Sequence, residues 1–180
     1  GNADRVFVRL SRQSIVDRGT IGWMVREFEK RNFDCSRLVA QVPERDAAKH
    51  IKQTRDIVKK LRKIGVAFAL EHYGIDQERF QILDILKPDY IKIDGELMHT
   101  LMTDSSMQES VQRIVTAAQK RGIKTVAERV ENANAMAVLF QLGLDYMQGH
   151  YVHEPEVVLQ DKDDSVKRRT LEELAAANAG

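Results

Sequence analysis

The sequence predicts an α/β protein in which strands and helices alternate around a parallel β-sheet. Short apolar runs rich in β-branched residues alternate with longer stretches that have the period of an amphipathic helix. Glycine or proline separates several of these helical stretches from the next apolar run. Such a chain forms either an open doubly wound sheet or a closed barrel, and 180 residues suffice for one domain with a sizeable core.

The expected strands coincide with the apolar runs, at residues 5–10, 37–42, 65–70, 90–93, 124–127 and 145–147. The expected helices lie between them, at residues 20–31, 46–64, 77–86, 107–121 and 132–142. Three of these helices end in "RKIGV", "KRGIK" and "QLGLD", where a glycine can adopt the left-handed conformation of a C-terminal cap. The helix at 77–86 ends before "KPDY", because proline cannot continue a helix.

The composition limits the kinds of partner. The chain has 28 Lys and Arg and 27 Asp and Glu, a formal net charge of +1, so it should not bind a nucleic acid polymer through bulk charge. The single cysteine, Cys35, cannot form an internal disulfide and is expected to be a small, partly buried thiol. The sequence contains no leader pattern and no apolar run long enough for a bilayer, so we expect a cytoplasmic location without membrane insertion.

Polar residues gather directly after the apolar runs, where parallel α/β proteins bind their ligands. They are Arg9, Ser11, Gln41, Glu44, Glu71, His72, Tyr73, Lys92, Asp94, Glu128, Glu131, Gln148, His153 and Glu154. Each can also be an ordinary loop or cap residue; Glu44, for example, suits the first turn of a helix with or without a site. Lys92, Glu128 and Gln148 recur at the same relative place on successive strands, which favours a shared site.

Six ordered motifs resemble those of the EAL domain. They are "VRLSRQSI", "QVPE", "ALEHYG", "KPDYIKID", "GIKTVAERVEN" and "LGLDYMQGHYVHEP", and the resemblance extends over residues 5–159. It implies a TIM-like (β/α) barrel that binds and often hydrolyses cyclic di-GMP. The strand that carries the family's Glu-Ala-Leu motif has no counterpart in this sequence. We therefore expect residues 1–160 to form a barrel that is incomplete at its N-terminal side, and residues 161–180 to form a tail or short surface helix.

The resemblance also implies that the metal site of the family has been lost. Active members use two divalent cations, which need several oxygen ligands of net negative charge. The family's Asn corresponds to Arg9, its first Glu of Glu-x-Thr-Glu to Gln41, and its adjacent Asp pair to Glu71 and His72. A permanent cation at position 9 opposes metal binding, and a nitrogen donor suits hard cations poorly. We therefore expect no metal cofactor and no enzymatic activity.

Ligand binding without metal is the alternative use of the same strand ends. In that interpretation Arg9 and Lys92 meet the two phosphates of cyclic di-GMP, Glu154 accepts hydrogen bonds from a guanine, and Tyr151 or Tyr73 offers a stacking face. The expected ligand-binding set is Arg9, Glu71, Tyr73, Lys92, Glu128, Gln148, Tyr151 and Glu154.

These losses are similar to those of degenerate, FimX-type receptor EAL domains. That likeness implies a signalling domain of type IV pilus or motility regulation, with a PilZ-type protein as partner and a homodimer as a further possibility. Two other functions stay open: a metal-dependent phosphodiesterase that tolerates Glu71 and His72, and a protein-docking platform that binds no nucleotide.

Overall fold

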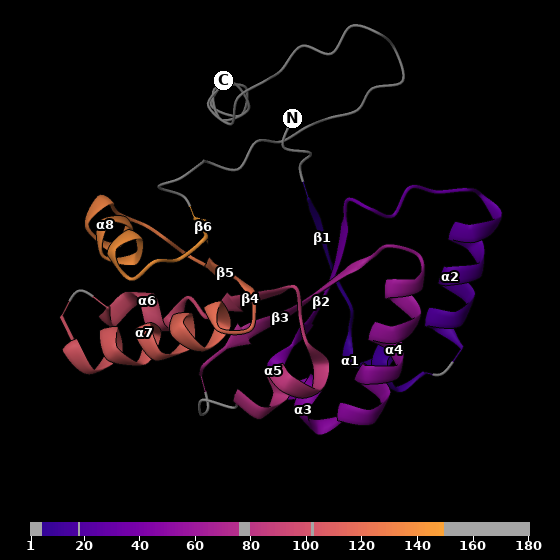
Figure 1. Cartoon of the computed structure of the whole chain (residues 1–180), viewed down its shortest axis with the longest axis horizontal. Coiled ribbons are helices and arrows are strands. Elements are labelled where there is room, and N and C mark those ends of the chain that lie inside the picture. The colour runs from indigo at the N-terminus through magenta and orange to yellow at the C-terminus, as the bar shows by residue number, and fades with distance from the viewer. Residues whose placement is uncertain (1–4, 18, 76–79, 102, 150–180) are drawn as a thin grey trace, which may run out of the picture.

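The computed structural model describes residues 5–17, 19–75, 80–101 and 103–149, and six parallel strands form one sheet within them (Figure 1). The strands are paired in chain order: β1 (Val6–Arg9), β2 (Leu38–Pro43), β3 (Ala67–Tyr73), β4 (Tyr90–Ile93), β5 (Lys124–Ala127) and β6 (Tyr146–Met147). The sheet is curved, and the helices lie along its outer side (Figure 1). This half-barrel confirms the predicted α/β class and the incomplete TIM-like barrel.

Helices connect the strands as predicted, with three differences in detail. They are α1 (Arg12–Val16), α2 (Thr20–Lys30), α3 (Glu44–Lys49), α4 (Ile51–Lys63), α5 (Phe80–Leu86), α6 (Glu96–Thr100), α7 (Ser105–Gln119) and α8 (Ala133–Gln141). The short helices α1 and α6 were not predicted. The single helix expected at 46–64 is divided into α3 and α4, because His50 has non-helical dihedral angles (φ −121°, ψ 44°).

Side chains cap three of these helices in ways that the sequence makes possible. The Asp104 carboxylate accepts a hydrogen bond from the backbone N–H of Ser106 (2.8 Å) at the start of α7. The Asn132 side chain does the same for Ala135 (2.8 Å) at the start of α8. Ser11 caps α1. Such caps satisfy backbone donors that the first turn of a helix leaves unpaired.

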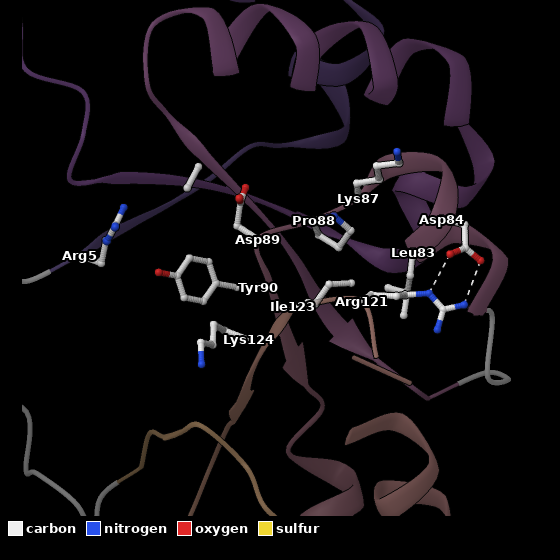
Figure 2. A pocket seen from close by; sticks show the side chains of 12 residues that line it. Arg5, Leu83, Asp84, Lys87, Pro88, Asp89, Tyr90, Arg121, Ile123 and Lys124 are labelled. Carbon is white, nitrogen blue, oxygen red and sulfur yellow. Dashed lines mark hydrogen bonds and ion pairs between the residues drawn. The ribbon is translucent and has the colours of Figure 1, made fainter. Parts of the chain in front are cut away.

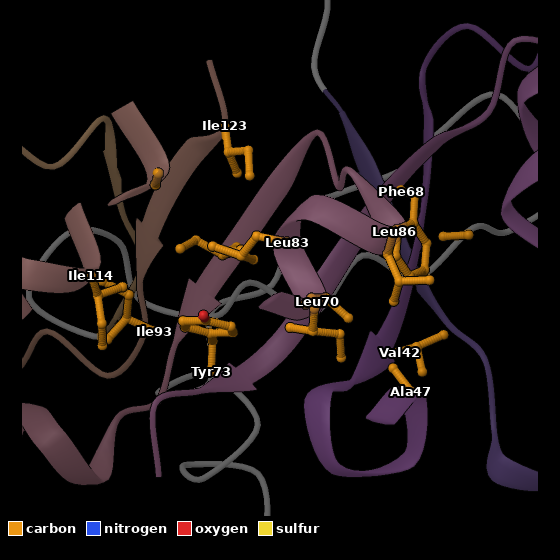
Figure 3. Packing of buried hydrophobic residues seen from close by; sticks show 14 of the residues in the cluster. Val42, Ala47, Phe68, Leu70, Tyr73, Leu83, Leu86, Ile93, Ile114 and Ile123 are labelled. Atoms are coloured by element: carbon orange, nitrogen blue, oxygen red, sulfur yellow. The ribbon is translucent and has the colours of Figure 1, made fainter. Parts of the chain in front are cut away.

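The hydrophobic core lies between the outer face of the sheet and the helices. Alternate residues of the strands point into it, among them Phe68 and Leu70 of β3 and Ile93 of β4, all completely buried (Figure 3). They pack against apolar residues of the helices, such as Leu83 and Leu86 of α5. Since strand side chains alternate between faces, the residues between these core positions point to the inner, concave side.

An irregularity in β3 changes this alternation at the strand end. Leu70 pairs with Ile91 and Tyr73 with Ile93, so three steps along β3 oppose two steps along β4. His72 occupies this bulge with a φ of 55°, in the left-handed region. The extra residue turns Tyr73 into the core, where it is completely buried (Figure 3). The predicted stacking role of Tyr73 is therefore wrong, because its ring does not face the inner side of the sheet.

Some predicted features lie outside the described residues, namely Tyr151, His153, Glu154 and the tail at 161–180. Among the residues that the structure does describe, no helix combines the length and the apolar character needed to cross a membrane.

Candidate functional site

An ion pair between Arg9 and Glu71 marks the inner side of the sheet. Arg9 is the last residue of β1, Glu71 lies near the end of β3, and Arg9 Nε is 2.7 Å from Glu71 Oε1. Because β2 separates the two strands, the side chains must meet above it, on the concave face. The Glu71 side chain is only 4% exposed, whereas Arg9 is 58% exposed. The guanidinium therefore neutralises a buried carboxylate while remaining in contact with solvent.

A second ion pair joins β4 to the end of β5. Lys92 Nζ is 2.7 Å from Glu128 Oε1, and both side chains are largely buried. The same ammonium lies 3.5 Å from Gln41 Oε1 of β2, again across an intervening strand. Lys92, Glu128 and Gln41 thus converge on the concave face beside the first ion pair.

His72 and Asp94 form the third polar contact at the strand ends. His72 Nδ1 is 2.6 Å from Asp94 Oδ2, and the other Asp94 oxygen accepts a hydrogen bond from the backbone N–H of Glu96 (2.7 Å). Asp94 is buried and the His72 side chain is 37% exposed. The start of α6 therefore fixes Asp94, and Asp94 fixes the ring of His72.

The surroundings of Glu71 link these contacts electrostatically. Burial raises the pKa of the Glu71 carboxyl group, the nearby Arg9, His72 and Lys92 oppose the rise, and Glu128 adds to it. Residues of all three contacts thus influence the ionisation of Glu71. The predicted site residues of β1, β3, β4 and β5 therefore share one electrostatic environment.

Gln148 follows β6 at the edge of the sheet. Its backbone N–H donates to Ala127 (2.8 Å), and its carbonyl accepts from Val130 (3.0 Å). The next residue, Gly149, lies so close to the backbone of Val130 that a Cβ there would be 2.3 Å away. Only glycine fits this contact, which holds the exposed Gln148 against the loop after β5.

Glu44 stabilises the end of β3, which carries part of the site. Its side chain is buried at the start of α3, and one oxygen accepts a hydrogen bond from Gly74 N (3.3 Å), directly after β3. It therefore helps to hold the β3 end, with its bulge, in place.

Phe7 is a residue of the site that sequence reasoning missed. Lys92 Nζ lies 5.4 Å from the centre of its ring, and the ring packs edge-on against Tyr90 (5.5 Å between centres). Phe7 stands two residues before Arg9, so the strand period alone puts both on one face. The two-residue period of the strand is therefore the signal in the sequence that could have identified Phe7.

A cavity of about 610 Å³ lies at the opposite end of the sheet (Figure 2). Its lining includes Ala67, Tyr90 and Lys124, the first residues of β3, β4 and β5. Asp84 and Arg121, also in the lining, are joined by hydrogen bonds of 2.8 and 2.9 Å. Because it borders the strand starts, this cavity is separate from the candidate site.

The side chains available as metal ligands determine whether this site could hold a metal ion. Across the described parts of the chain, no group of three or more His, Cys, Asp or Glu side chains is arranged to hold a metal ion. The carboxylates of Glu71 and Glu128 each face a cationic side chain instead.

A half-barrel with a polar, charge-paired cluster at the carboxyl ends of its strands places the chain in the (β/α)-barrel class. The chain belongs to the EAL domain family, whose family model matches residues 1–155.

Related structures and sequences agree with this assignment. The FimX EAL domain from Pseudomonas aeruginosa bound to c-di-GMP has 28% sequence identity and a TM-score of 0.77, over 83% of this chain and 61% of that chain. The Xanthomonas citri FimX EAL domain in complex with c-diGMP has 26% identity and a TM-score of 0.78, over 90% and 64%. The probable cyclic di-GMP phosphodiesterase PdeA of Escherichia coli K12 is 25% identical over 152 residues, 84% of this chain. The chain spans about a fifth of the length of that relative (21%).

Proposed function

We propose that this domain binds cyclic di-GMP at the carboxyl ends of its strands, without a metal, and does not hydrolyse it. The observation that carries the proposal is the pair of cations, Arg9 and Lys92, on the concave face, each beside a carboxylate. A cyclic dinucleotide has two phosphates, and the two cations are suited to meet them. The two FimX structures described above contain this nucleotide.

The electrostatics support binding without metal. A divalent cation about 5 Å from the Arg9 guanidinium would be repelled by about 7 kcal/mol at an effective dielectric constant of 20 and by about 2 kcal/mol in water. Glu71 could serve as a metal ligand only beside this guanidinium, which is 2.7 Å away. His72 offers a nitrogen donor, and its Nδ1 faces Asp94. The residues present therefore fit a pair of hard cations poorly.

A phosphodiesterase is the second candidate, because several curated relatives bear that name, PdeA and the Escherichia coli PdeL among them. PdeL is 29% identical over 128 residues. Under this hypothesis, Lys92, Glu128 and Gln148 belong to a catalytic site at the strand ends, and Glu71 replaces an aspartate as a metal ligand.

Calorimetric titration with cyclic di-GMP in EDTA, followed by chromatography of the nucleotide after incubation with manganese, separates these functions. We expect binding in EDTA and recovery of the intact dinucleotide. Formation of the linear dinucleotide would support the phosphodiesterase. Absence of nucleotide binding, both with and without metal, would leave the protein-docking platform as the remaining function.

For the output of the signal, we propose a PilZ-type protein partner, by analogy with the FimX-type receptors. Co-purification of the domain with a PilZ-type protein from the same genome, with and without cyclic di-GMP, tests this partner. An interaction that does not depend on the nucleotide would contradict a relay function.

A further inference from the structure

Helix α4 concentrates positive charge on its outer side. It carries six of the chain's 28 Lys and Arg residues and one of its 27 Asp and Glu residues, which leaves 22 basic and 26 acidic residues for the rest of the chain. Lys52, Lys59 and Lys63 are exposed and share the side of the helix that faces away from the core. The core side of α4 is formed by its four buried residues, Thr54, Ile57, Val58 and Leu61. A chain that is almost neutral in total therefore has one strongly basic face.

The cations on this outer side are poorly neutralised by neighbouring residues. Arg62, at the end of α4, pairs with Asp89 at 3.7 Å, and both side chains are well exposed. In the part of the chain that the structure describes, no ion pair joins Lys52, Lys59 or Lys63 to a carboxylate. These three ammonium groups are therefore available to an external partner that carries negative charge.

Helix α2 adds an exposed tryptophan to the same surface. It packs beside α4 on the outer side of the sheet (Figure 1). Because Ile21 and Phe28 of α2 pack toward the core, Trp23 and Lys30 lie on its outward side. Trp23 is 59% exposed. An indole ring is well suited to the boundary between water and an apolar phase.

We propose that the outer face of α2 and α4 binds the surface of a membrane that contains anionic lipids. In this arrangement the lysines of α4 lie near the headgroups, and Trp23 lies at the boundary with the acyl chains. Each Lys or Arg close to such a surface strengthens binding about fivefold, so a cluster on one helix is sufficient for peripheral attachment. The contact requires no helix to enter the bilayer.

Two features favour a lipid surface over a nucleic acid as the polyanion. The helices lie on the outer side of a curved sheet, so a flat surface can approach them without obstruction (Figure 1). Single-stranded nucleic acids are instead held in basic grooves with aromatic side chains for base stacking, and the sequence of α4 contains no aromatic residue. Lysine also acts as a hydrated point charge, which suits a diffuse array of headgroups better than recognition of one particular phosphate.

This attachment is independent of the proposed nucleotide site. The polar site lies on the concave side of the sheet, whereas α2 and α4 lie on its outer side. A domain bound to a membrane through α2 and α4 would therefore keep its strand ends open to a ligand.

The fluorescence of Trp23 gives a direct test in the full chain, because it is the single tryptophan of the sequence. The protein is mixed with phosphatidylcholine vesicles that contain about 30% phosphatidylglycerol, and separately with vesicles of phosphatidylcholine alone. We expect cosedimentation and a blue shift of the tryptophan emission with the anionic vesicles only. Both effects should disappear in about 1 M salt, where charges are screened beyond about 3 Å.

Charge reversal on α4 identifies the face that makes the contact. Lys59→Glu removes one attraction and adds one repulsion, so we expect it to weaken binding to the anionic vesicles about 30-fold. Lys120→Glu is the matched control, because it makes the same change at an exposed position at the end of α7, which packs over β5. It should change the affinity by less than about twofold. Equal melting temperatures of both variants and the wild type confirm that each is folded.

Three results would overturn the proposal. The first is that the wild type does not bind the anionic vesicles. The second is binding that Lys59→Glu does not weaken, or that leaves the emission of Trp23 unchanged, since another face would then make the contact. The third is that a single-stranded DNA oligonucleotide, and not the vesicles, binds in a manner sensitive to Lys59→Glu, which would make nucleic acid the partner of this face.

Discussion

Replacing Glu71 by glutamine distinguishes the metal-free receptor from the phosphodiesterase by the sign of its effect on the affinity for cyclic di-GMP. The carboxylate lies 2.7 Å from Arg9 and is almost fully buried. If Arg9 binds a phosphate of the ligand, Glu71 is a neighbouring negative charge that repels it. If instead the site holds metal, Glu71 is one of its few anionic ligands. Glutamine keeps the size of the side chain and one acceptor oxygen, but it removes the charge and replaces the second oxygen with an NH2 donor.

The expected magnitude follows from Coulomb's law. Two unit charges about 5 Å apart repel by about 3 kcal/mol at an effective dielectric constant of 20 and by about 0.8 kcal/mol in water. Arg9 is 58% exposed, so a phosphate bound to it is partly solvated and the lower value applies. We therefore expect Glu71→Gln to tighten the binding of cyclic di-GMP by about 1 kcal/mol, or about fivefold.

The assay is calorimetric titration in EDTA at two salt concentrations. Glu131→Gln is the matched control, since it removes the same charge from an exposed position on the loop before α8. We expect the control to change the affinity by less than about twofold, and its effect to vanish at the higher salt concentration, as for other exposed charges.

Weaker binding by Glu71→Gln would refute the repulsion argument. If the loss appeared only in the presence of manganese, and hydrolysis were lost with it, Glu71 would be a metal ligand and the domain an enzyme. An unchanged dissociation constant would mean that the ligand phosphate lies well away from Arg9, which removes Arg9 from the binding set.

Three further predictions concern stability and the correction at Tyr73. Asp145→Asn should lower the free energy of unfolding by about 1–3 kcal/mol at neutral pH, in urea titrations, since its carboxylate pairs with Lys124 (2.6 Å) and accepts from Thr125 N (2.9 Å). Burial opposes ionisation of Asp145, but these hydrogen bonds leave its pKa below the ordinary value. The stability that the carboxylate contributes is therefore present above the unfolded pKa and is lost as the pH falls through the folded pKa. If Asp145→Asn lowered the free energy of unfolding by the same amount in acid as at neutral pH, this reasoning would be contradicted. Gly149→Ala should cost about 2 kcal/mol or more, because its Cβ would lie 2.3 Å from backbone atoms, and an unchanged melting temperature would exclude the close contact. Tyr73→Ala should lose about 3–5 kcal/mol of stability as a core residue, whereas Tyr73→Phe should leave the affinity for cyclic di-GMP unchanged; weaker binding by the latter would restore a ligand role for Tyr73.

The sequence predicts the strands and those helices that contain a long periodic pattern, because the spacing of apolar residues shows which face is buried. Helix α1, with five residues, has too few turns for such a pattern, and the break at His50 depends on two dihedral angles rather than on a breaker residue. Tyr73 was misplaced for a related reason: strict alternation puts it beside Glu71, and a bulge of one residue reverses its face.

The site could be predicted as a set of positions but not as a set of contacts. Arg9, Glu71, Lys92 and Glu128 all lie at strand ends, as parallel topology requires. That Arg9 pairs with Glu71 across β2 depends on the curvature of the sheet, which no local pattern encodes.

The pairing of Arg9 with Glu71 also explains why an arginine is suited to this position if the site binds phosphate. Its Nε faces Glu71, and the exposure of its side chain allows the terminal nitrogens to donate to a ligand at the same time. The carboxylate then keeps its counter-charge when the ligand binds, so binding avoids the cost of leaving a buried carboxylate without one. A lysine carries its three donors on a single nitrogen, so it lacks the separation between the Nε that faces the carboxylate and the terminal nitrogens that can reach a ligand. The ion pair of the ligand-free site is therefore compatible with anion binding, because the ligand adds to it instead of replacing it.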